Sequence, residues 1–390
     1  MTKKVRITLY IVSLIITSVV LVLLIFNEKI LHPANSQGVH QQAGGQESTE
    51  TVGDNQITDS TEQSGSAHRP GGSGAGRGET TTIVFAGDVL IAEAMEQYYD
   101  AEGVTRLVSE ELLAEMQNAD ICMVNNEFQF STQGTPMEDK QFTFRTDPKY
   151  VQVMLDMGVD IVSLANNHSL DFGTEALKDT FATLDDAGIL YAGAGDSKGR
   201  AEALQIIEVN GLKFGFLAAT RVIPVSQWNV EFRRPGLFTT YDDTRLVECI
   251  EAAREECDFL TVYVHWGIER EAYPQDYQTA IAKNCFNAGA DLVIGAHPHV
   301  LQGIEFMNGK PVFYSLGNYI FAQTIARTAL VKVEVQSDGE ATYSLIPAYA
   351  EDGRTMEFEG TAAVELFDYM NEISPRAFID EKGYIYDIDE

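Results

Sequence analysis

Four histidines follow runs of apolar residues, at positions where a strand is expected to end. The four are His168, His265, His297 and His299. Asp88, Glu127 and Asn167 occupy equivalent positions. A single histidine at a strand end is more often an ordinary surface residue than a ligand. Independent accidents explain the repetition poorly, so the pattern favours one shared site.

Imidazole together with carboxylate is the ligand chemistry that borderline divalent ions accept, zinc, manganese and iron among them. If Asp88 and Glu127 lie side by side without a cation, they repel each other and one tends to take up a proton. A bound cation removes that conflict. The residue types therefore predict a divalent metal site at the strand ends.

The His297-Pro298-His299 sequence is the most distinctive local motif. Proline fixes φ near −65° and favours an extended or turned path, so two imidazoles can approach a metal from one loop. The alternative interpretation of this motif is a rigid turn without a ligand.

A second motif is Asn166-Asn167-His168, with Asp171 three residues later. The amide oxygen can bind a metal, while the histidine or the aspartate can serve as a second ligand, a general acid or a charge stabiliser. The alternative is an asparagine-rich turn that caps a helix beginning at Thr174.

Other catalytic templates do not compete with a metal site. The chain has no GxSxG elbow, no GxxxxGK[ST] loop and no GxGxxG that opens a helix after a strand. Its four cysteines, at positions 122, 249, 257 and 285, lack CxxC spacing. Buried thiols are favoured over a disulfide framework or a zinc site, and pairing in an oxidising compartment stays open.

The elements that must position these side chains alternate between strands and helices. Apolar runs at 83–86, 121–124, 161–165, 259–264, 292–294 and 312–316 are typical of strands buried on both faces. Helical patterns occupy 104–116, 174–187, 242–256 and 275–288, and Asp147-Pro148 marks another helix start. This alternation predicts a largely parallel sheet, whose strands place their site at their carboxyl ends.

Two later stretches predict hairpins rather than crossovers. Segments 204–209 and 213–217 flank Asn210-Gly211, and segments 330–335 and 342–346 flank Asp338-Gly339. Such pairs favour tight hairpin turns. We therefore expect a second, partly antiparallel sheet packed on the first, and we assign no role to the acidic tail from residue 374.

The N-terminus predicts a membrane anchor. Lys3, Lys4 and Arg6 precede an uncharged apolar run over 7–26, and a helix of that length would rise about 30 Å, enough to cross a bilayer. The alternative, a cleaved secretory signal, would have a shorter apolar region and a small-residue cleavage site near residue 26. The positive-inside bias then places residues 1–6 in the cytoplasm and the remainder outside the cell.

Residues 27–80 are rich in Gly, Ser, Gln and Thr and nearly lack large apolar side chains, which predicts a flexible extracellular stalk. The 390-residue chain has a formal net charge of −31. An acidic exported domain is a poor partner for nucleic acid, and any anionic substrate would need a local cationic site.

Six blocks in this order resemble the CapA family of poly-γ-glutamate capsule synthesis proteins, itself similar to the calcineurin-like metallophosphoesterases. The blocks are FAGD at 85–88, NNE at 125–127, ANNH at 165–168 with Asp171, HWGIE at 265–269, GAHPHVLQ at 295–302 and SLGN at 315–318. The resemblance implies a four-layer α/β/β/α sandwich over residues 81–350, followed by a C-terminal extension over 351–390.

The resemblance also implies a set of site residues. The metal ligands matched by position are Asp88, Glu127, Asn167, His265, His297 and His299. His168 matches the histidine that assists the leaving group, with Asp171 beside it. The residues we expect to contact substrate are Asn125, Arg145, Glu269 and Asn318. Two divalent ions, of Mn, Fe or Zn, would be held between the sheet edges.

Two functions follow from the resemblance. In the first, the domain is an accessory component of a membrane complex that synthesises or exports polyglutamate, and it binds the polymer through a basic groove. The groove candidates are Arg145, Arg221, Arg233, Arg234 and Arg270. In the second, it is an exported metal-dependent hydrolase acting on a phosphoester or an amide. Gly87-Asp88 stands where typical metallophosphoesterases have Asp-x-His, which favours the accessory function.

Overall fold

The computed structural model describes residues 80–230 and 234–388. The predicted cytoplasmic segment 1–6, the anchor 7–26 and the stalk up to residue 79 lie outside the described residues. Among the residues that are described, no helix combines the length and the apolar character needed to cross a membrane.

The first sheet has ten strands, with a parallel part and an antiparallel part. The strands β1, β2, β5 and β6 pair in parallel, and β1 pairs antiparallel with β16 on its other side. Along the sheet the order is β19-β20-β17-β16-β1-β2-β5-β6, with β15 beside β1 and β18 beside β17. The bounds are β1 Thr81–Val89, β2 Ile121–Asn126, β5 Ile161–Ser163, β6 Leu190–Ala192, β15 Asn318–Ile320, β16 Ile325–Val335, β17 Ala341–Glu351, β18 Arg354–Glu357, β19 Ala377–Ile379 and β20 Tyr384–Asp387.

The second sheet has six strands, in the order β13-β14-β12-β11-β9-β8. Its central strands β14, β12, β11 and β9 are parallel, and each edge strand is antiparallel to its neighbour. The bounds are β8 Gln205–Val209, β9 Leu212–Thr220, β11 Phe259–His265, β12 Leu292–Ala296, β13 Ile304–Met307 and β14 Lys310–Phe313. Two short pairs lie apart from the large sheets: β3 Gln129–Phe130 with β4 Arg145–Thr146, and β7 Ala194–Gly195 with β10 Gly236–Leu237.

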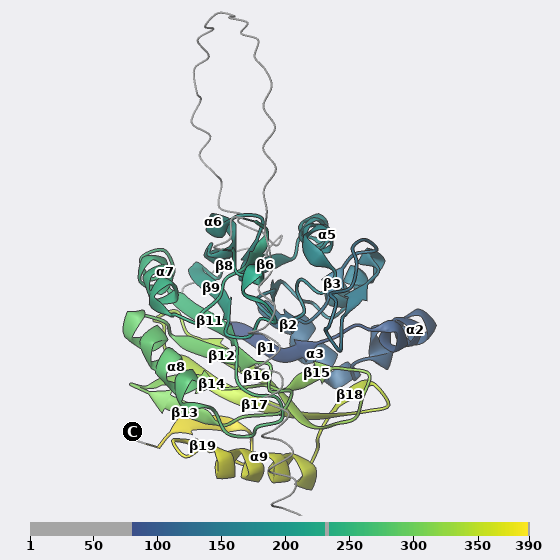
Figure 1. Ribbon diagram of the computed structural model, residues 1–390. Helices are drawn as coiled ribbons and strands as arrows, with labels where there is room; N and C mark the ends of the chain where they lie inside the picture. Colours follow the sequence, from purple (N-terminus) through teal and green to yellow (C-terminus); the bar gives the residue numbers. More distant parts are fainter. Residues whose placement is uncertain (1–79, 231–233, 389–390) are drawn as a thin grey trace, which may run out of the picture. The chain divides into compact units, whose positions relative to one another are not determined.

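Helices lie on the outer faces of the two sheets, except that α9 packs at one end of the core between them (Figure 1). They are α2 Glu93–Glu102, α3 Glu110–Asn118, α4 Val151–Asp156, α5 Gly173–Ala187, α6 Lys198–Ala201, α7 Thr244–Arg254, α8 Asp276–Ala288 and α9 Thr361–Ile373, with short 3-10 turns η1 Val104–Arg106, η2 Pro148–Tyr150 and η3 Ser226–Trp228. Alternate residues of β1 divide between two cores. Val84 packs with α3 and α5, whereas Phe85 packs against the second sheet. The outer face of β11 packs on α7 and α8.

The mixed α/β architecture with two sheets is confirmed, and so are both predicted hairpins. Asn210 and Gly211, with φ of 52° and 80°, form the two-residue turn between β8 and β9. The expected second, partly antiparallel sheet is present, but only the first hairpin belongs to it. β9 pairs with β11 in the six-stranded sheet, whereas β16 pairs with β1 in the ten-stranded sheet. A turn signal fixes only local pairing, and the choice of sheet depends on contacts distant in sequence.

The helix predicted over 104–116 is also corrected. Residues 104–106 form a 3-10 turn, and α3 begins only at Glu110. Ser109 caps it, because its hydroxyl accepts a hydrogen bond from the Leu112 N–H at 3.4 Å. Asp147 performs the predicted capping role at η2, where its carboxylate accepts from Lys149 N at 3.0 Å.

The segment after residue 350 continues the same fold. β18, β19 and β20 extend the ten-stranded sheet, and α9 buries Leu366, Phe367, Met370 and Ile373 in the core shared by the two sheets. Ile379 and Ile385 from the acidic tail join that core. In Figure 1, α9 and β19 close one end of the sandwich. The tail therefore has a structural role that its composition does not reveal.

Candidate metal centre

The polar clusters meet because parallel strands of both sheets end at the same place. Asp88 lies near the end of β1 and pairs in register with Asn125 of β2, and Glu127 follows β2 by one residue. From the second sheet, His265 ends β11 and His297 follows β12. The strands β11 and β12 are fully buried, which explains why their histidines stand only at or just after the strand ends.

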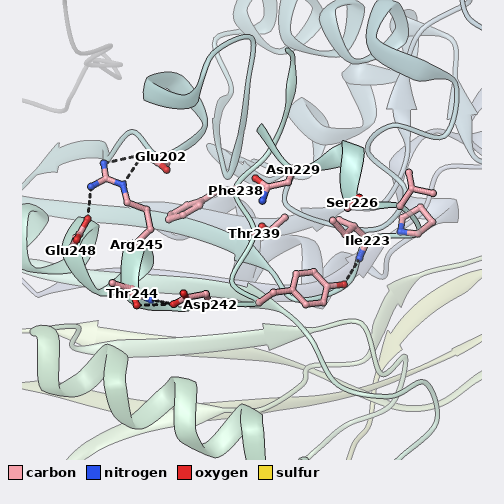
Figure 2. Close-up of a pocket in the computed structure, with 13 residues that line it drawn as sticks. Glu202, Ile223, Ser226, Asn229, Phe238, Thr239, Asp242, Thr244, Arg245 and Glu248 are labelled. Carbon is pink, nitrogen blue, oxygen red and sulfur yellow. Dashed lines mark hydrogen bonds and ion pairs between the residues drawn. The ribbon is translucent and has the colours of Figure 1, made fainter. Parts of the chain in front are cut away.

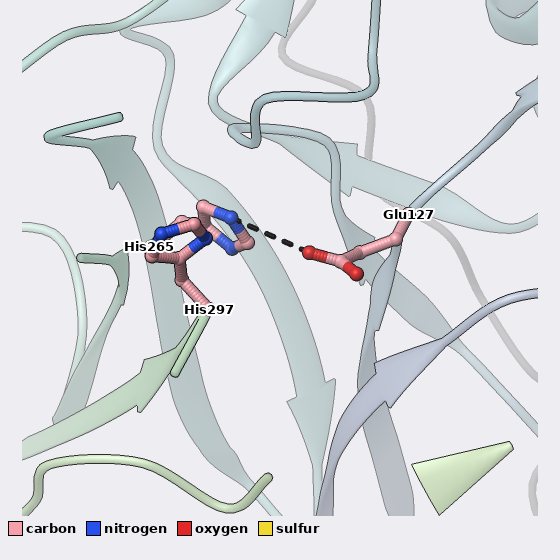
Figure 3. A group of neighbouring side chains, drawn as sticks. All are labelled: Glu127, His265 and His297. Carbon is pink, nitrogen blue, oxygen red and sulfur yellow. Dashed lines mark ion pairs between the residues drawn. The ribbon is translucent and has the colours of Figure 1, made fainter. Parts of the chain in front are cut away.

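Two groups of ligand atoms share Glu127. In one group it lies with His265 and His297, and in the other with Asp88 and His299; within each group all ligand atoms lie within 4.8 Å of one another. Figure 3 shows Glu127 extending toward His265 and His297, with His265 Nε2 at 3.3 Å from Glu127 Oε1. His299 Nδ1 lies 3.4 Å from Asp88 Oδ2 and 4.0 Å from Glu127 Oε2.

The unsatisfied polar atoms of this cluster fit a divalent cation. Both Glu127 carboxylate oxygens and His297 Nδ1 are buried and accept or donate no hydrogen bond within the described structure. Burying an ionised carboxylate without a partner costs roughly several kcal/mol. Buried polar atoms without a hydrogen-bond partner are therefore rare in folded proteins. A cation shared by carboxylate and imidazole would satisfy them together.

The pKa shifts within the cluster also fit a bound cation. Burial raises the pKa of Glu127, and the neighbouring Asp88 raises it further. Burial lowers the pKa of His265, and it lowers the pKa of His297 to about 4. These two imidazoles are therefore neutral at physiological pH, which is the form that binds metal.

His299 differs from the other two histidines. Burial opposes its charge, but the attraction of Glu127 and the hydrogen bond to Asp88 outweigh burial and raise its pKa to about 10. The neighbouring carboxylates thus favour the cationic form of His299. A bound cation would instead favour the neutral imidazole, which is the form that binds metal.

The His297-Pro298-His299 loop has a conformation that the sequence does not predict. His297 and His299 both have positive φ, 99° and 59°. Positive φ at non-glycine residues costs roughly 1–3 kcal/mol and is concentrated at functional sites. The loop is therefore neither extended nor a simple proline turn, and the surrounding packing must hold it in place.

A close approach between two backbones fixes Asp88. A Cβ on Gly87 would lie 1.9 Å from the carbonyl oxygen of Gly317, and the Asp88 N–H donates to that same oxygen at 2.9 Å. Glycine at position 87 therefore allows β1 to pack against the 315–318 segment. Thr328 supports this segment by donating to Leu316 O at 3.1 Å.

Asn167 joins the cluster through its side chain. Its Oδ1 lies 2.7 Å from His265 Nε2. Asn166 instead faces inward, donating to Asn126 O at 2.8 Å and accepting from His168 N at 3.0 Å. The alternative interpretation of this motif as a helix cap is wrong, because Phe172 is the N-cap of α5 and makes no side-chain capping bond.

His168 and Asp171 form a buried pair beside the centre. His168 Nδ1 lies 2.7 Å from Asp171 Oδ2, which also accepts from Phe144 N at 2.8 Å. Burial lowers the pKa of His168, and Asp171 opposes that shift. The pair has the arrangement of an imidazole oriented by a carboxylate, which leaves Nε2 for proton transfer.

Two of the residues predicted to contact substrate are buried and contact candidate metal ligands. Asn125 is fully buried and donates to Asp88 Oδ1 at 2.8 Å, and Asn318 is 2% exposed with its Oδ1 2.7 Å from His299 Nδ1. Both side chains therefore orient ligands from behind. That these two side chains also contact substrate stays a prediction.

The other two predicted substrate contacts are exposed and lie outside the two ligand groups. The Arg145 guanidinium donates to Gln133 O at 2.8 Å and stacks on the Phe172 ring at 4.4 Å. Glu269 is exposed, and its charge contributes to the raised pKa of Glu127.

Of the four described arginines that were candidates for a basic groove, Arg145, Arg221 and Arg234 use their guanidinium groups in contacts within the protein. Arg234 donates to Gln227 O at 2.6 Å, and Arg221 stacks between Tyr241 and Tyr277, with its guanidinium 4.6 Å and 5.1 Å from their ring centres. Arg270 is exposed, and its backbone N–H donates to Pro298 O at 2.7 Å. Arg233 lies outside the described residues.

Lys140 is a site residue that the sequence does not reveal. Its ammonium donates to the Asn167 carbonyl and to the Asp171 carboxylate, and it lies 3.2 Å from His168 Nδ1. It belongs to the irregular 131–144 loop, which has neither strand nor helix periodicity. No local signal connects such a loop to the strand ends.

A separate cavity of about 580 Å³ lies beside α7 and contains none of the predicted ligands (Figure 2). Phe238, Thr239 and Tyr241 form part of its wall. Its one arginine, Arg245, pairs with Glu202 at 2.9 Å and Glu248 at 2.8 Å, so it offers no free positive charge to an anion.

The fold and the site together define an α/β domain with two sheets and a candidate metal centre between their strand ends, and the sequence comparison places it in a family. The family model described as "Bacterial capsule synthesis protein PGA_cap" matches residues 82–323. This span covers both parallel sheet centres and every predicted ligand. The chain belongs to this bacterial capsule synthesis family.

Two of the named relatives come from Bacillus species. The chain is 33% identical to the "PGA biosynthesis protein CapA" of Bacillus subtilis (strain 168) over 213 residues, which is 54% of this chain and only 56% of that protein. It is 28% identical to the "Capsule biosynthesis protein CapA" of Bacillus anthracis over 70% of this chain and 69% of that protein. Among solved structures, a 5'-nucleotidase from Candida albicans SC5314 aligns with a TM-score of 0.41 and 11% identity, over 76% of this chain and 56% of that one.

Proposed function

We propose that this protein is a metal-binding accessory component of poly-γ-glutamate synthesis or export. The observation that carries the proposal is the sharing of Glu127 by two groups of ligands whose buried atoms lack other partners. Family membership and the printed names of the Bacillus relatives supply the process. The expected polymer is anionic, and the expected partners are the synthase or export subunits of a membrane complex, not nucleic acid.

The proposed centre binds two divalent ions of Mn, Fe or Zn. Glu127, His265 and His297 would hold one ion with the help of Asn167, and Asp88, Glu127 and His299 would hold the other. A divalent cation there would stabilise negative charge on a phosphoryl or carbonyl oxygen as a Lewis acid. Asn125 and Asn318 fix the orientation of Asp88 and His299, and such outer partners contribute to metal affinity.

The second candidate function, an exported metal-dependent hydrolase acting on a phosphoester or an amide, is supported by the His168–Asp171 pair. Asp171 accepts a hydrogen bond from His168 Nδ1, which fixes the tautomer and leaves Nε2 to carry a proton. A polymer-binding accessory protein has no need of such a pair. Turnover of a small phosphorylated substrate would distinguish the two functions.

The proposed cellular arrangement follows from the sequence. We expect residues 7–26 to span the membrane once, residues 1–6 to lie in the cytoplasm, and the domain to hang outside the cell from the 27–80 stalk. The formal net charge of −31 is consistent with an exported domain that approaches an anionic polymer only through local sites.

The test uses the full chain in detergent, as wild type and as His297→Ala, with His68→Ala from the predicted stalk as the matched control. Metal content, phosphodiester hydrolysis and polyglutamate binding are measured before and after chelation. We expect His297→Ala to lose metal and the control to keep it. Hydrolysis that disappears with the metal supports the hydrolase, and polymer binding that survives chelation supports the accessory function. Full metal content and unchanged activities in His297→Ala would overturn the metal centre.

A further inference from the structure

Lys140 is almost buried, yet it approaches the centre from a loop. Its side chain is 13% exposed, and the ammonium lies 5.3 Å from the centre of the Trp228 ring. Lysine is almost never buried unless it is paired, because its charge loses hydration. Here the Asp171 carboxylate and the Asn167 carbonyl replace that hydration. The arrangement requires the 131–144 loop to fold over the turn that follows β5.

Asp171 depends on Lys140 for only one of its two carboxylate oxygens. Lys140 donates to Oδ1, whereas Oδ2 accepts from Phe144 N and interacts with His168 Nδ1. The contact that links Lys140 most directly to a candidate metal ligand is the one to Asn167. No other side chain among the described residues has a hydrogen bond to the Asn167 carbonyl, and the side chain of the same residue reaches His265 at 2.7 Å. Fixing that peptide therefore fixes the direction from which the amide oxygen enters the centre.

We infer that Lys140 is a positioning residue of the metal centre, which fastens the 131–144 loop onto Asn167 and the His168–Asp171 pair. The inference rests on the proposed metal centre. Because coupling between two equilibria is reciprocal, a loop that favours metal binding must itself be held more firmly when metal is bound.

A charge effect and a positioning effect predict opposite results when the ammonium is removed. Lys140 is a cation beside a cation site, so its charge alone opposes metal binding. Removal of the charge alone would therefore strengthen metal binding. Loss of a partner that orients a ligand typically weakens metal affinity by about 10–100-fold. The sign of the change separates the two roles.

The experiment measures Mn²⁺ affinity by calorimetry on the full chain in detergent. Lys140→Met is compared with wild type, with Lys140→Arg, and with Lys178→Met on the exposed face of α5 as the matched control. We expect Lys140→Met to bind Mn²⁺ about 10–100-fold more weakly, Lys140→Arg to recover most of the loss, and the control to match wild type. Unchanged or tighter binding in Lys140→Met would overturn the inference.

A double-mutant cycle with Asn167→Ala tests whether Lys140 affects metal binding through Asn167. If Lys140 acts through Asn167, the double variant should bind Mn²⁺ hardly more weakly than Asn167→Ala alone, because the two residues act as one unit. If the two fold-changes multiply, Lys140 acts independently of Asn167 and the proposed route is wrong.

Proteolysis of the metal-free protein tests the attachment of the loop by Lys140 independently of whether the centre binds metal. Phe142, in the same loop, is 59% exposed and offers a chymotrypsin site. In metal-free protein we expect faster cleavage at Phe142 in Lys140→Met than in wild type or Lys178→Met, while circular dichroism shows that all three are folded. Equal cleavage rates would refute the loop attachment. If wild type binds no Mn²⁺, the proposed centre fails, and cleavage alone decides whether Lys140 fastens the loop.

Discussion

At the scale of single residues, Glu127 is the candidate ligand on which cation binding depends most. It belongs to both ligand groups, and neither of its oxygens has a hydrogen-bond partner within the described structure. Asp88 and burial both disfavour its charge. A residue in this situation contributes little to the stability of the protein alone and much to the binding of a cation.

Glu127→Gln should therefore separate metal binding from stability. The amide keeps the shape of the side chain and removes the disfavoured charge, so we expect metal-free Glu127→Gln to melt no lower than metal-free wild type. Mn²⁺ at 100 times the Kd would stabilise wild type by about 2.7 kcal/mol, and we expect Glu127→Gln to lose that gain. Thermal melts with chelator and with Mn²⁺ measure the stability without metal and the gain from Mn²⁺. Glu269→Gln, at an exposed carboxylate, is the control. A melting temperature of Glu127→Gln that still rises with Mn²⁺ would contradict the role of Glu127 as a metal ligand.

At the scale of elements, the centre depends on how closely β1 approaches the 315–318 segment. The Gly317 carbonyl lies where a side chain on Gly87 would be, and it accepts the Asp88 N–H. The position of Asp88 is thus set by backbone packing between segments about 230 residues apart, rather than by its own side-chain contacts alone.

Gly87→Ala should disturb both stability and the centre. The added methyl would overlap the Gly317 carbonyl, and such overpacking costs about 1–3 kcal/mol. Asp88 would move with β1, so Mn²⁺ affinity should fall as well. Gly199→Ala is the matched control: nothing lies within 4 Å of its added Cβ, and the change should be neutral or stabilising by up to about 1 kcal/mol. Denaturant unfolding measures the free energy of unfolding. Equal stability for the two variants would contradict the prediction, because it would mean that β1 can shift to accommodate the methyl group without loss of stability.

The sequence predicts the elements better than it predicts their partners. Strand ends and the Asn210-Gly211 turn are local features, so the candidate ligands after β1, β2, β5, β11 and β12 could be found from spacing. Pairing of β16 with β1, and closure of the Lys140 loop, depend on contacts between distant segments. The bond from the buried Asn125 side chain to Asp88 could not be predicted either, because residue type does not reveal which way a buried side chain faces.

At the scale of the whole domain, the residues that complete the fold lie beyond those that form the centre. The family match ends at residue 323, and every candidate ligand precedes it. Yet β16 and β17 form the antiparallel half of the first sheet, and α9 with β19 and β20 fills one end of the core between the sheets. The centre requires both sheets to keep their spacing, so this distant segment supports it indirectly.

Truncation after residue 350 should therefore abolish metal binding although it removes no ligand. The deletion takes away four buried side chains of α9, Leu366, Phe367, Met370 and Ile373. Each stabilises the fold by roughly 1.5–3 kcal/mol, or roughly 6–12 kcal/mol together. A domain is stable by only about 5–15 kcal/mol, so the shortened chain should not hold the two sheets together. Circular dichroism and Mn²⁺ calorimetry on chains ending at 350 and at 388 give the comparison. The longer chain should match wild type, and a chain ending at 350 that melts cooperatively at the wild-type temperature with full Mn²⁺ affinity would show that the centre is independent of the C-terminal closure.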